Sequence, residues 1–256
     1  MPEEKHKGER IAKRIARAGL CSRRDAEKWI EKGRVQVNGK VIASPALNVT
    51  GDDKIAVDGK ILGQDEETRL FLYHKPAGLV TSHKDEKGRD TVFDKLPDDL
   101  PRVISIGRLD LNTEGLLLLT NDGELSRYLE LPATGWKRRY RVRVHGRVEA
   151  KKLESLKKGI KVDGVSYKSI EASIDALPEG ESKVGANTWL TLALKEGKNR
   201  EIRKVMEAIG LKVTRLIRTD YGPFSLGKLE RGRVLEVKPK VLKQQILGYF
   251  KDKPEG

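Results

Sequence analysis

Asp110 is the residue of this sequence whose surroundings most favour chemistry. It lies in the polar stretch 107–115, Gly-Arg-Leu-Asp-Leu-Asn-Thr-Glu-Gly, two residues after Arg108. An alternating segment, 104–106, precedes this stretch and an apolar run, 116–119, follows it. The pattern predicts a loop between two strands, the second of them buried. Loops held by buried strands often carry catalytic groups, although Asp beside Asn, Thr and Gly is also ordinary turn chemistry.

The charge of the chain indicates a polyanionic partner. Its 256 residues include 52 Lys plus Arg and 38 Asp plus Glu, a net charge of +14. Residues 10–40 contain ten basic and three acidic residues, so half of the net charge lies there. A second basic cluster, 136–148, contains no acidic residue. Clustering of this kind favours nucleic acid as the partner.

Several classes of protein are disfavoured. Cys21 is the only cysteine, which leaves no intramolecular disulfide or cysteine-based zinc site and indicates a reducing compartment. The four histidines have no ligand spacing, so we predict no metal. A membrane-spanning helix needs about 20 apolar residues, and no apolar run of the sequence approaches that length. The N-terminus has no apolar signal-peptide core. We therefore expect a cytoplasmic protein without a membrane anchor.

The first part of the chain reads as two short helices and a small sheet after a flexible tail, 1–8. Gly19 is expected to end the first helix, and Ser22 to cap the second, which ends at Gly33. Asn38-Gly39 and Asp58-Gly59 are typical hairpin turns. The predicted strands are 34–37, 40–42 and 54–57. A polar linker, 63–68, follows.

The second part is predicted to be α+β with a mainly antiparallel sheet, because strands outnumber helices. Asn199 is the expected N-cap of a helix that Gly210 ends, and 178–185 is an expected polar loop. The predicted strands are 69–73, 104–106, 116–120, 140–144, 160–165, 169–174, 188–194, 212–218 and 234–237. The predicted helices are 92–96, 125–131, 150–158, 199–209 and 242–250.

Residues 9–60 resemble the S4-type RNA-binding domain. The resemblance rests on Ser-Arg-Arg-Asp-Ala at 22–26, Gly-Arg-Val at 33–35 and Val-Asn-Gly-Lys at 37–40. It implies RNA contacts by the basic side chains of the two helices and the sheet, which are Arg10, Lys13, Arg14, Arg17, Arg23, Arg24, Lys28, Arg34 and Lys40. A basic helical face suits RNA that is recognised through backbone and shape, whereas an ordinary solvated surface is the alternative.

Four further motifs, in order along the chain, resemble those of pseudouridine synthases. They are Lys-Pro-Ala-Gly at 75–78, Gly-Arg-Leu-Asp at 107–110, Arg-Tyr at 139–140 and Asn-Arg-Glu-Ile-Arg at 199–203. With the S4-like domain in front, the sequence is similar to the RsuA/RluB family, and most similar to its RluB branch. The resemblance implies a small S4-like domain, 9–60, followed by a larger catalytic domain, 69–250, with a mainly antiparallel mixed sheet.

The implied activity is isomerisation of a specific uridine to pseudouridine in ribosomal RNA, with 23S RNA favoured. The family breaks the N1–C1′ bond, turns the uracil and rejoins it through C5. The resemblance makes Asp110 the catalytic carboxylate, and a group that acts as a nucleophile or base must be ionised, which a nearby cation favours. The reaction is an isomerisation, so we predict no cofactor.

Other site residues follow from the same resemblance. Arg203 is expected to form a salt bridge with Asp110, and Tyr140 to stack on the target base and to assist removal of the C5 proton. Arg108 is expected to fill the vacancy left by a flipped base or to hold a phosphate. Substrate contacts are predicted for Ile202, Lys75 and Asn199, and RNA contacts for Arg138 and Arg139. Without the resemblance, Arg203 would be interpreted as a solvated surface cation, Tyr140 as an ordinary strand aromatic and Ile202 as a core residue.

Three other functions stay open on the sequence. The substrate could be 16S rather than 23S RNA. An S4-type RNA-binding or ribosome-assembly factor without activity would not need Asp110, Tyr140 and Arg203 together. A metal-dependent nuclease would need clustered carboxylates or histidines. The expected partner is ribosomal RNA or a pre-ribosomal particle, and we expect a monomer.

Overall fold

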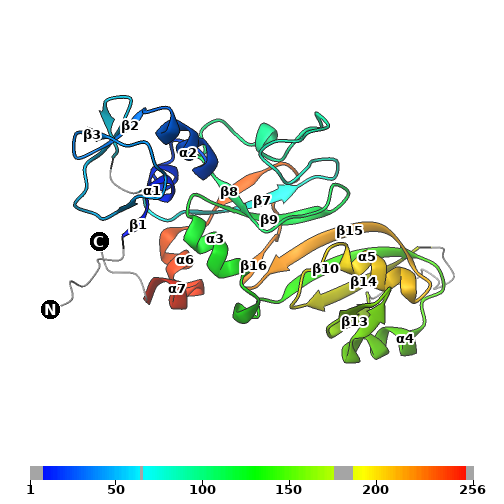
Figure 1. The fold of residues 1–256 in the computed structure, drawn as a ribbon. Helices are drawn as coiled ribbons and strands as arrows, with labels where there is room; N and C mark the ends of the chain where they lie inside the picture. The colour runs from blue at the N-terminus through cyan, green and yellow to red at the C-terminus, as the bar shows by residue number, and fades with distance from the viewer. Residues whose placement is uncertain (1–7, 64–65, 176–186, 252–256) are drawn as a thin grey trace. The chain divides into compact units, whose positions relative to one another are not determined.

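The computed structural model describes residues 8–63, 66–175 and 187–251, which fall into two compact units (Figure 1). The first comprises residues 1–68 with 99–104 and 121–123, and the second comprises the remaining residues. The predicted tail, apart from Gly8, lies outside the described residues, as do two linker residues, 64–65, and the predicted loop 178–185.

The first unit has the predicted helices and hairpins. Ser22 caps the second helix as expected, since its Oγ accepts a hydrogen bond of 3.1 Å from the backbone N–H of Asp25. Asn38 and Asp58 have φ of 51° and 49°, the left-handed backbone of the predicted turns. The elements are β1 Glu9–Arg10, α1 Ile11–Arg17, α2 Arg23–Glu31, β2 Val35–Val37, β3 Lys40–Val41, β4 Asn48–Val49, β5 Ile55–Val57 and β6 Lys60–Ile61.

The second unit is built on a sheet of nine strands, and the predicted α+β class is confirmed. The strand order is β13-β14-β10-β15-β9-β7-β17, with β8 beside β9 and β16 beside β15. The pairs β13–β14, β14–β10, β10–β15, β15–β16, β9–β7 and β7–β17 are antiparallel, whereas β9 and β15 are parallel. The strands are β7 Leu70–Lys75, β8 Ile104–Ile106, β9 Glu114–Thr120, β10 Arg138–His145, β13 Ile170–Ile174, β14 Asn187–Leu194, β15 Lys212–Tyr221, β16 Phe224–Ser225 and β17 Val234–Glu236. A separate hairpin joins β11 Ile160–Val162 and β12 Val165–Tyr167.

Helices complete two apolar clusters of this unit. Helices α3 Gly123–Glu130, α6 Pro239–Gln245 and α7 Leu247–Lys251 contribute to one cluster with β7 and β9. Helices α4 Ala150–Ser155 and α5 Glu201–Ala208 contribute to the other with β10 and β14. Short 3-10 turns are η1 Phe93–Lys95, η2 Pro132–Thr134 and η3 Leu156–Lys158. The predicted single helix 242–250 is wrong, because the non-helical backbone of Ile246, whose side chain is buried, separates α6 from α7.

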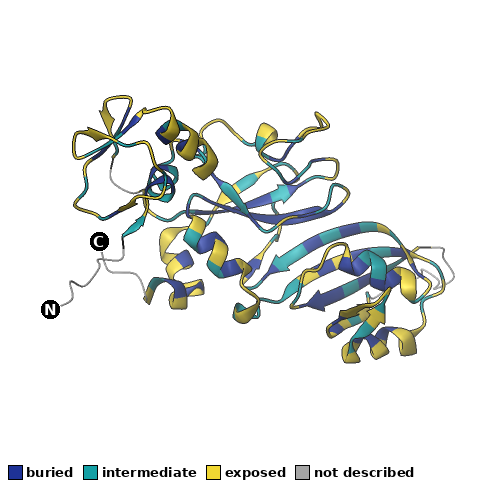
Figure 2. Cartoon of the chain, viewed as in Figure 1, coloured by how far each residue is buried: buried dark blue, intermediate teal, exposed yellow. Residues whose placement is uncertain are grey.

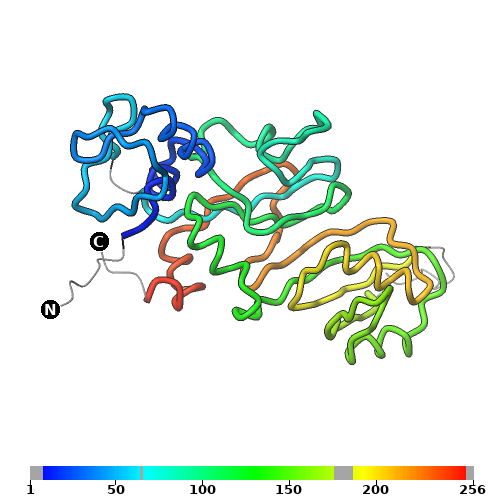
Figure 3. Tube along the Cα trace, viewed as in Figure 1, coloured from blue at the N-terminus to red at the C-terminus, as the bar shows by residue number. Residues whose placement is uncertain are grey.

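Gly115 allows the parallel contact between β9 and β15. It pairs with Arg218, which brings β9 and β15 side by side although they lie far apart in sequence (Figure 3). Its φ is +101°, and a Cβ at this position would lie 2.2 Å from the carbonyl oxygen of Arg218. Only glycine fits so close an approach without a shift of the backbone.

The start of α5 differs from the prediction. Asn199 is not the N-cap: Arg200 takes that position with a left-handed φ of 52° and makes no side-chain cap hydrogen bond. Two hydrogen bonds tie Glu201, the first residue of the helix, to Lys198 in the preceding turn. The buried Glu201 Oε2 accepts from the Lys198 N–H at 2.9 Å, and the Glu201 N–H donates to the Lys198 carbonyl at 3.2 Å.

The carboxyl groups of Glu201 and Glu196 lie close together near the start of α5. Burial raises the pKa of Glu201 to about 7, and the neighbouring carboxylate of Glu196 adds to the shift. The pKa of Glu196 is lowered: burial alone would raise it, but hydrogen bonds from the backbone N–H of Lys168 and from Lys198 outweigh that effect. Glu201 therefore holds the proton of this pair, and Glu196 holds the charge.

The Glu201 proton makes stability depend on pH. Because its pKa is raised in the folded state, its contribution is full below the ordinary value near 4.5 and is lost as pH rises through about 7. We expect the free energy of unfolding of the wild-type protein, relative to Glu201→Gln, to fall by up to about 3 kcal/mol between pH 4.5 and 8. Urea denaturation at each pH measures this difference. Glu207→Gln, an exposed site on the same helix, should show no such trend; a constant difference for Glu201→Gln would contradict the assignment.

Candidate active site

The loop 107–113, which carries Asp110, is fixed by hydrogen bonds to its backbone groups. Its five carbonyl groups from residue 109 to residue 113 all accept hydrogen bonds. The donors are Thr81 Oγ1 to Leu109, Lys75 Nζ to Asp110, Leu111 and Thr113, and Arg203 Nη2 to Asn112. At the start of the loop, the Gly107 N–H donates to Glu130 Oε1 at 2.9 Å. The loop is therefore fixed without use of the Asp110 side chain.

Lys75 at the end of β7 makes most of these contacts. Its side chain has 0% exposure, and its amino group lies 3.0–3.3 Å from the carbonyl oxygens of Pro76, Asp110, Leu111 and Thr113. Burial lowers its pKa to about 8, against the opposing effect of the carboxylates of Asp110 and Glu114. In this structure Lys75 positions the loop, and its predicted substrate contact stays a prediction.

Thr81 ties a second segment to the same loop. Its Oγ1 donates to the Leu109 carbonyl at 2.9 Å and accepts from the Leu109 N–H at 3.3 Å. Thr81 follows Val80, which forms an isolated bridge with Thr91. The segment 80–92 therefore begins and ends at fixed points beside the Asp110 loop.

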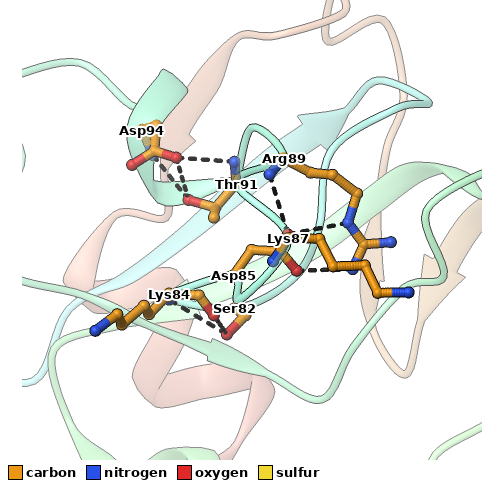
Figure 4. A network of polar contacts seen from close by, with 7 residues as sticks. All are labelled: Ser82, Lys84, Asp85, Lys87, Arg89, Thr91 and Asp94. Carbon is orange, nitrogen blue, oxygen red and sulfur yellow. Dashed lines mark hydrogen bonds and ion pairs between the residues drawn. The ribbon is translucent and has the colours of Figure 1, made fainter.

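The segment is also ordered internally (Figure 4). Asp85 accepts hydrogen bonds from the backbone N–H groups of Lys87 and Arg89 and from the Arg89 guanidinium, which together hold the pKa of its carboxyl far below the ordinary value. At the other end, Asp94 accepts from the N–H and Oγ1 of Thr91 at 2.9 and 2.8 Å. These contacts make a compact loop with exposed lysine side chains.

Arg203 on α5 reaches the loop, but not as predicted. Its Nη2 donates to the Asn112 carbonyl at 2.9 Å, and within the described part of the chain it forms no ion pair with Asp110. Burial lowers the Arg203 pKa and nearby Arg200 adds to this, whereas the charge of Asp110 acts in the opposite direction. The carboxylate therefore acts on Arg203 through space, and the expected salt bridge is absent from this structure.

The Asp110 carboxylate itself has no hydrogen bond or ion pair to any other residue that the structure describes. The residue is half-buried. Nearby, the Arg203 Nε and the Thr113 Oγ1 are buried, and neither has a hydrogen-bond partner among the described residues. An available carboxylate beside unused donors is the arrangement of a site that acts on a bound molecule.

Tyr140 and Ile202 lie in the same apolar cluster, with exposed fractions of 8% and 5%. Tyr140 comes from β10, opposite Leu192 and Arg218, and Ile202 lies one residue before Arg203 at the start of α5. The structure thus places Tyr140 and Ile202 in one apolar cluster, and Arg203 beside the Asp110 loop. Their predicted contacts with a base stay predictions.

The other predicted residues of this unit divide into two groups. Arg108, Asn199 and Arg139 are exposed. Arg138 is engaged within the unit, because it donates to the Lys195 carbonyl and the Tyr221 hydroxyl and lies over the Tyr221 ring. RNA contact by Arg138 would therefore have to compete with these bonds.

The predicted RNA-binding cations of the first unit also differ in their surroundings. Arg34 forms an ion pair with Asp58 and lies over the Trp29 ring, and Arg10 donates to the Ala46 carbonyl. Lys13 and Arg17 both pair with Glu9. Arg14 is half-buried, whereas Arg23, Arg24, Lys28 and Lys40 are exposed.

Sequence reasoning missed a buried carboxylate directly after the loop. Glu114 accepts two hydrogen bonds from Arg215, at 2.8 and 3.0 Å, and an ion pair from Arg231 at 3.2 Å. The hydrogen bonds from Arg215 lower its pKa more than burial raises it. Its partners lie about a hundred residues away, and no local pattern identifies them. Thr81 was missed for the same reason.

The described residues contain neither a candidate metal-binding group nor a candidate membrane span. No group of three or more His, Cys, Asp or Glu side chains there could hold a metal ion. None of the described helices has the length and apolar character to cross a membrane.

Comparison with known protein families matches both units. The RNA pseudouridylate synthase family matches residues 69–208, and the S4 domain matches residues 9–62. A solved structure titled "Crystal structure of pseudouridylate synthase" has a TM-score of 0.63 and 27% identity, and covers 93% of this chain and 100% of its own.

Two relatives match nearly the whole chain. A protein of Rickettsia felis, described as an uncharacterized RNA pseudouridine synthase, is 48% identical over 92% of this chain and 100% of its own length. The ribosomal large subunit pseudouridine synthase B of Pseudomonas aeruginosa is 42% identical over 92% of this chain and 62% of its own length. Together with the two matched domains, these relatives show that the chain belongs to the RNA pseudouridylate synthase family, in the RsuA/RluB branch with an N-terminal S4 domain.

Proposed function

We propose that this RNA pseudouridine synthase isomerises one uridine of 23S ribosomal RNA, with Asp110 as the catalytic carboxylate. The observation that carries the proposal is the Asp110 side chain, half-buried and without a partner in the described part of the chain, on a loop whose carbonyl groups from 109 to 113 all accept hydrogen bonds. A fixed carboxylate with no other task is suited to attack or to proton transfer at a bound nucleoside.

The reaction needs few protein groups. The N1–C1′ bond of uridine breaks, the uracil turns, C5 bonds to C1′, and the C5 proton leaves while N1 gains one, so the atoms balance without a co-reactant. Asp110 would act at the sugar or the base, and Tyr140, at the edge of its cluster, would face the uracil. The unpaired Arg203 Nε supplies a donor for the carboxylate or the RNA once substrate is bound.

The remaining predicted roles concern how RNA is held. Arg108 is exposed two residues before Asp110, as a side chain that replaces a flipped base or contacts a phosphate should be. The S4-like domain, proposed as 9–60, would bind the RNA backbone beside the catalytic domain, proposed as 69–250. We further propose that the protein acts as a monomer in the cytoplasm, on ribosomal RNA or a pre-ribosomal particle.

The choice of 23S RNA rests on the relatives. Proteins named ribosomal large subunit pseudouridine synthase B from Pseudomonas aeruginosa and Pasteurella multocida are 42% and 43% identical to this chain. The alternatives are 16S RNA as substrate or an S4-type protein that binds RNA without catalysis. An available Asp110 on a fixed loop favours catalysis over binding alone.

Removal of the Asp110 carboxylate tests the mechanism. We expect Asp110→Asn and Asp110→Ala to lower the rate of pseudouridine formation by about 10³-fold or more, because no described neighbour can replace the carboxylate. Tritium release from RNA that contains 5-tritiated uridine measures the rate, and RNA affinity should change little. Asp98→Asn, at an exposed carboxylate of the same unit, is the matched control. Full activity in Asp110→Asn, with deamidation excluded, would refute the assignment.

Lys75→Met tests whether the buried amino group positions the loop. Loss of the donor leaves buried carbonyl groups unpaired, so we expect a loss of about 3 kcal/mol in stability and a fall in kcat of about 10- to 100-fold. KM for RNA should stay nearly constant, since Lys75 has no exposed atoms. Steady-state kinetics and urea denaturation give both quantities. Lys87→Met, at an exposed lysine, should alter neither; a change in KM alone would return Lys75 to substrate binding.

The substrate is identified in cells. Pseudouridines are mapped in total RNA from a strain without this gene and from its parent. We expect the loss of a single site in 23S RNA, restored by the wild-type gene but not by the Asp110→Asn gene. Loss of a 16S site would change the substrate, and an unchanged map would favour the non-catalytic alternative.

A further inference from the structure

One face of the catalytic sheet carries a row of arginines that the proposed reaction does not use. Along β10, Arg139, Arg141 and Arg143 alternate with the buried side chains of Tyr140, Val142 and Val144. Figure 2 shows this alternation of buried and more exposed segments along the strand. Because successive side chains of a strand point to opposite faces, these arginines lie on the face away from Tyr140.

The neighbouring strands add an aromatic ring and a fourth arginine. Arg143 lies directly between Trp189 of β14 and Arg215 of β15. The guanidinium carbons of Arg141 and Arg215 lie 4.7 and 6.0 Å from the centre of the Trp189 ring. We call Arg139, Arg141, Arg143, Arg215 and Trp189 the arginine face.

The guanidinium groups of Arg141, Arg143 and Arg215 are held in position. The Arg141 Nε donates to Asp175 Oδ2 at 3.0 Å and its Nη2 forms an ion pair with the same oxygen, while its side chain stays 51% exposed. The Arg143 Nε donates to the Thr214 hydroxyl at 3.1 Å. Stacking on an aromatic ring and hydrogen bonds at one edge leave the other edge of a guanidinium group directed to solvent, as phosphate recognition requires.

Carboxylates neutralise only part of the face. Asp175 pairs with Arg141 and Glu114 pairs with Arg215, whereas Arg139 and Arg143 form no ion pair within the part of the chain that the structure describes. Arg139 lies opposite Asp220 of β15, whose carboxylate accepts a hydrogen bond from the Thr219 hydroxyl. Glu171, on the edge strand β13, is paired with Lys137, and the charge of Arg139 helps to lower its pKa. The face is therefore positively charged, which complements a phosphate backbone and disfavours an apolar or basic protein partner.

We propose that the arginine face binds the phosphodiester backbone of a second segment of the RNA substrate, outside the site built around Asp110 and Tyr140. This inference rests on RNA as the substrate, as proposed above. Phosphate contacts by arginine position a folded RNA without reading its bases. Such contacts would add affinity and orientation to those of the S4-like domain, and would not take part in the chemical step.

The test is the triple variant Arg139→Gln/Arg141→Gln/Arg143→Gln in the full chain. Binding is measured by fluorescence anisotropy with a labelled RNA hairpin that contains the mapped uridine. Because glutamine cannot neutralise a phosphate, we expect Kd at moderate salt to rise about tenfold or more, and the slope of log affinity against log salt to shrink by about 2 to 3. The single-turnover rate at saturating enzyme should stay within about twofold of wild type.

The matched control removes three lysines from the helical side of the same unit. Lys151→Gln/Lys157→Gln/Lys158→Gln changes the net charge equally at exposed positions of α4 and η3, and should shift Kd less than about threefold. Arg→Lys replacements at the three β10 positions keep the charge and should recover part of the affinity. Melting temperatures verify that every variant is folded.

Several outcomes would overturn the proposal. They are an unchanged Kd and salt slope in the folded triple variant, or an equal loss of affinity in the lysine control. Normal affinity for the hairpin with lower activity only on ribosomal particles would assign the face to a protein partner instead. The proposed function fails separately, if the wild-type protein binds the hairpin but forms no pseudouridine.

Discussion

The loop that carries Asp110 depends on one buried charge. The Lys75 ammonium group has no exposed atoms and is stabilised by four backbone carbonyls, three of which belong to residues 110–113. A buried cation without partners costs several kcal/mol, so any displacement of the loop that withdrew these carbonyls would be strongly unfavourable. The position of Asp110 is therefore coupled to the core of the sheet, although the loop itself consists of turn-forming residues.

The strands around this lysine are held by a second constraint, the close approach at Gly115. Lys75 of β7 lies opposite Gly115 of β9, and Arg218 of β15 lies on the other side of the same glycine. The absent side chain lets β15 approach β9, so that the Arg218 Nε donates to the Leu116 carbonyl at 2.7 Å. Because β15 also pairs with β10, this contact links the strand of Tyr140 to the loop of Asp110. The strand of Tyr140 and the strand that follows the Asp110 loop thus belong to one sheet.

Local patterns identified much of this fold, whereas the long-range contacts of the site could not be found from them. The Ser22 cap, the Asn38-Gly39 turn and the buried strand β9 could all be predicted, since each depends on a few adjacent residues. The true start of α5 could not, because it depends on the buried Glu201 and its hydrogen bond to Lys198 rather than on Asn199. The anchoring of the loop by Lys75, Thr81 and Arg203 spans tens of residues, and no spacing in the sequence reveals it.

The contrast between Asp110 and Glu114 explains why the absent salt bridge is useful. Glu114 accepts two hydrogen bonds from Arg215 and forms an ion pair with Arg231, as suits a structural carboxylate. Lys75 and Arg203 instead donate to loop carbonyls; burial lowers the pKa of both, and the Asp110 carboxylate opposes this shift through space. Two cations thus lie close to Asp110 without occupying its oxygens. A carboxylate in such a field keeps its lone pairs available, which a nucleophile or base at a nucleoside requires.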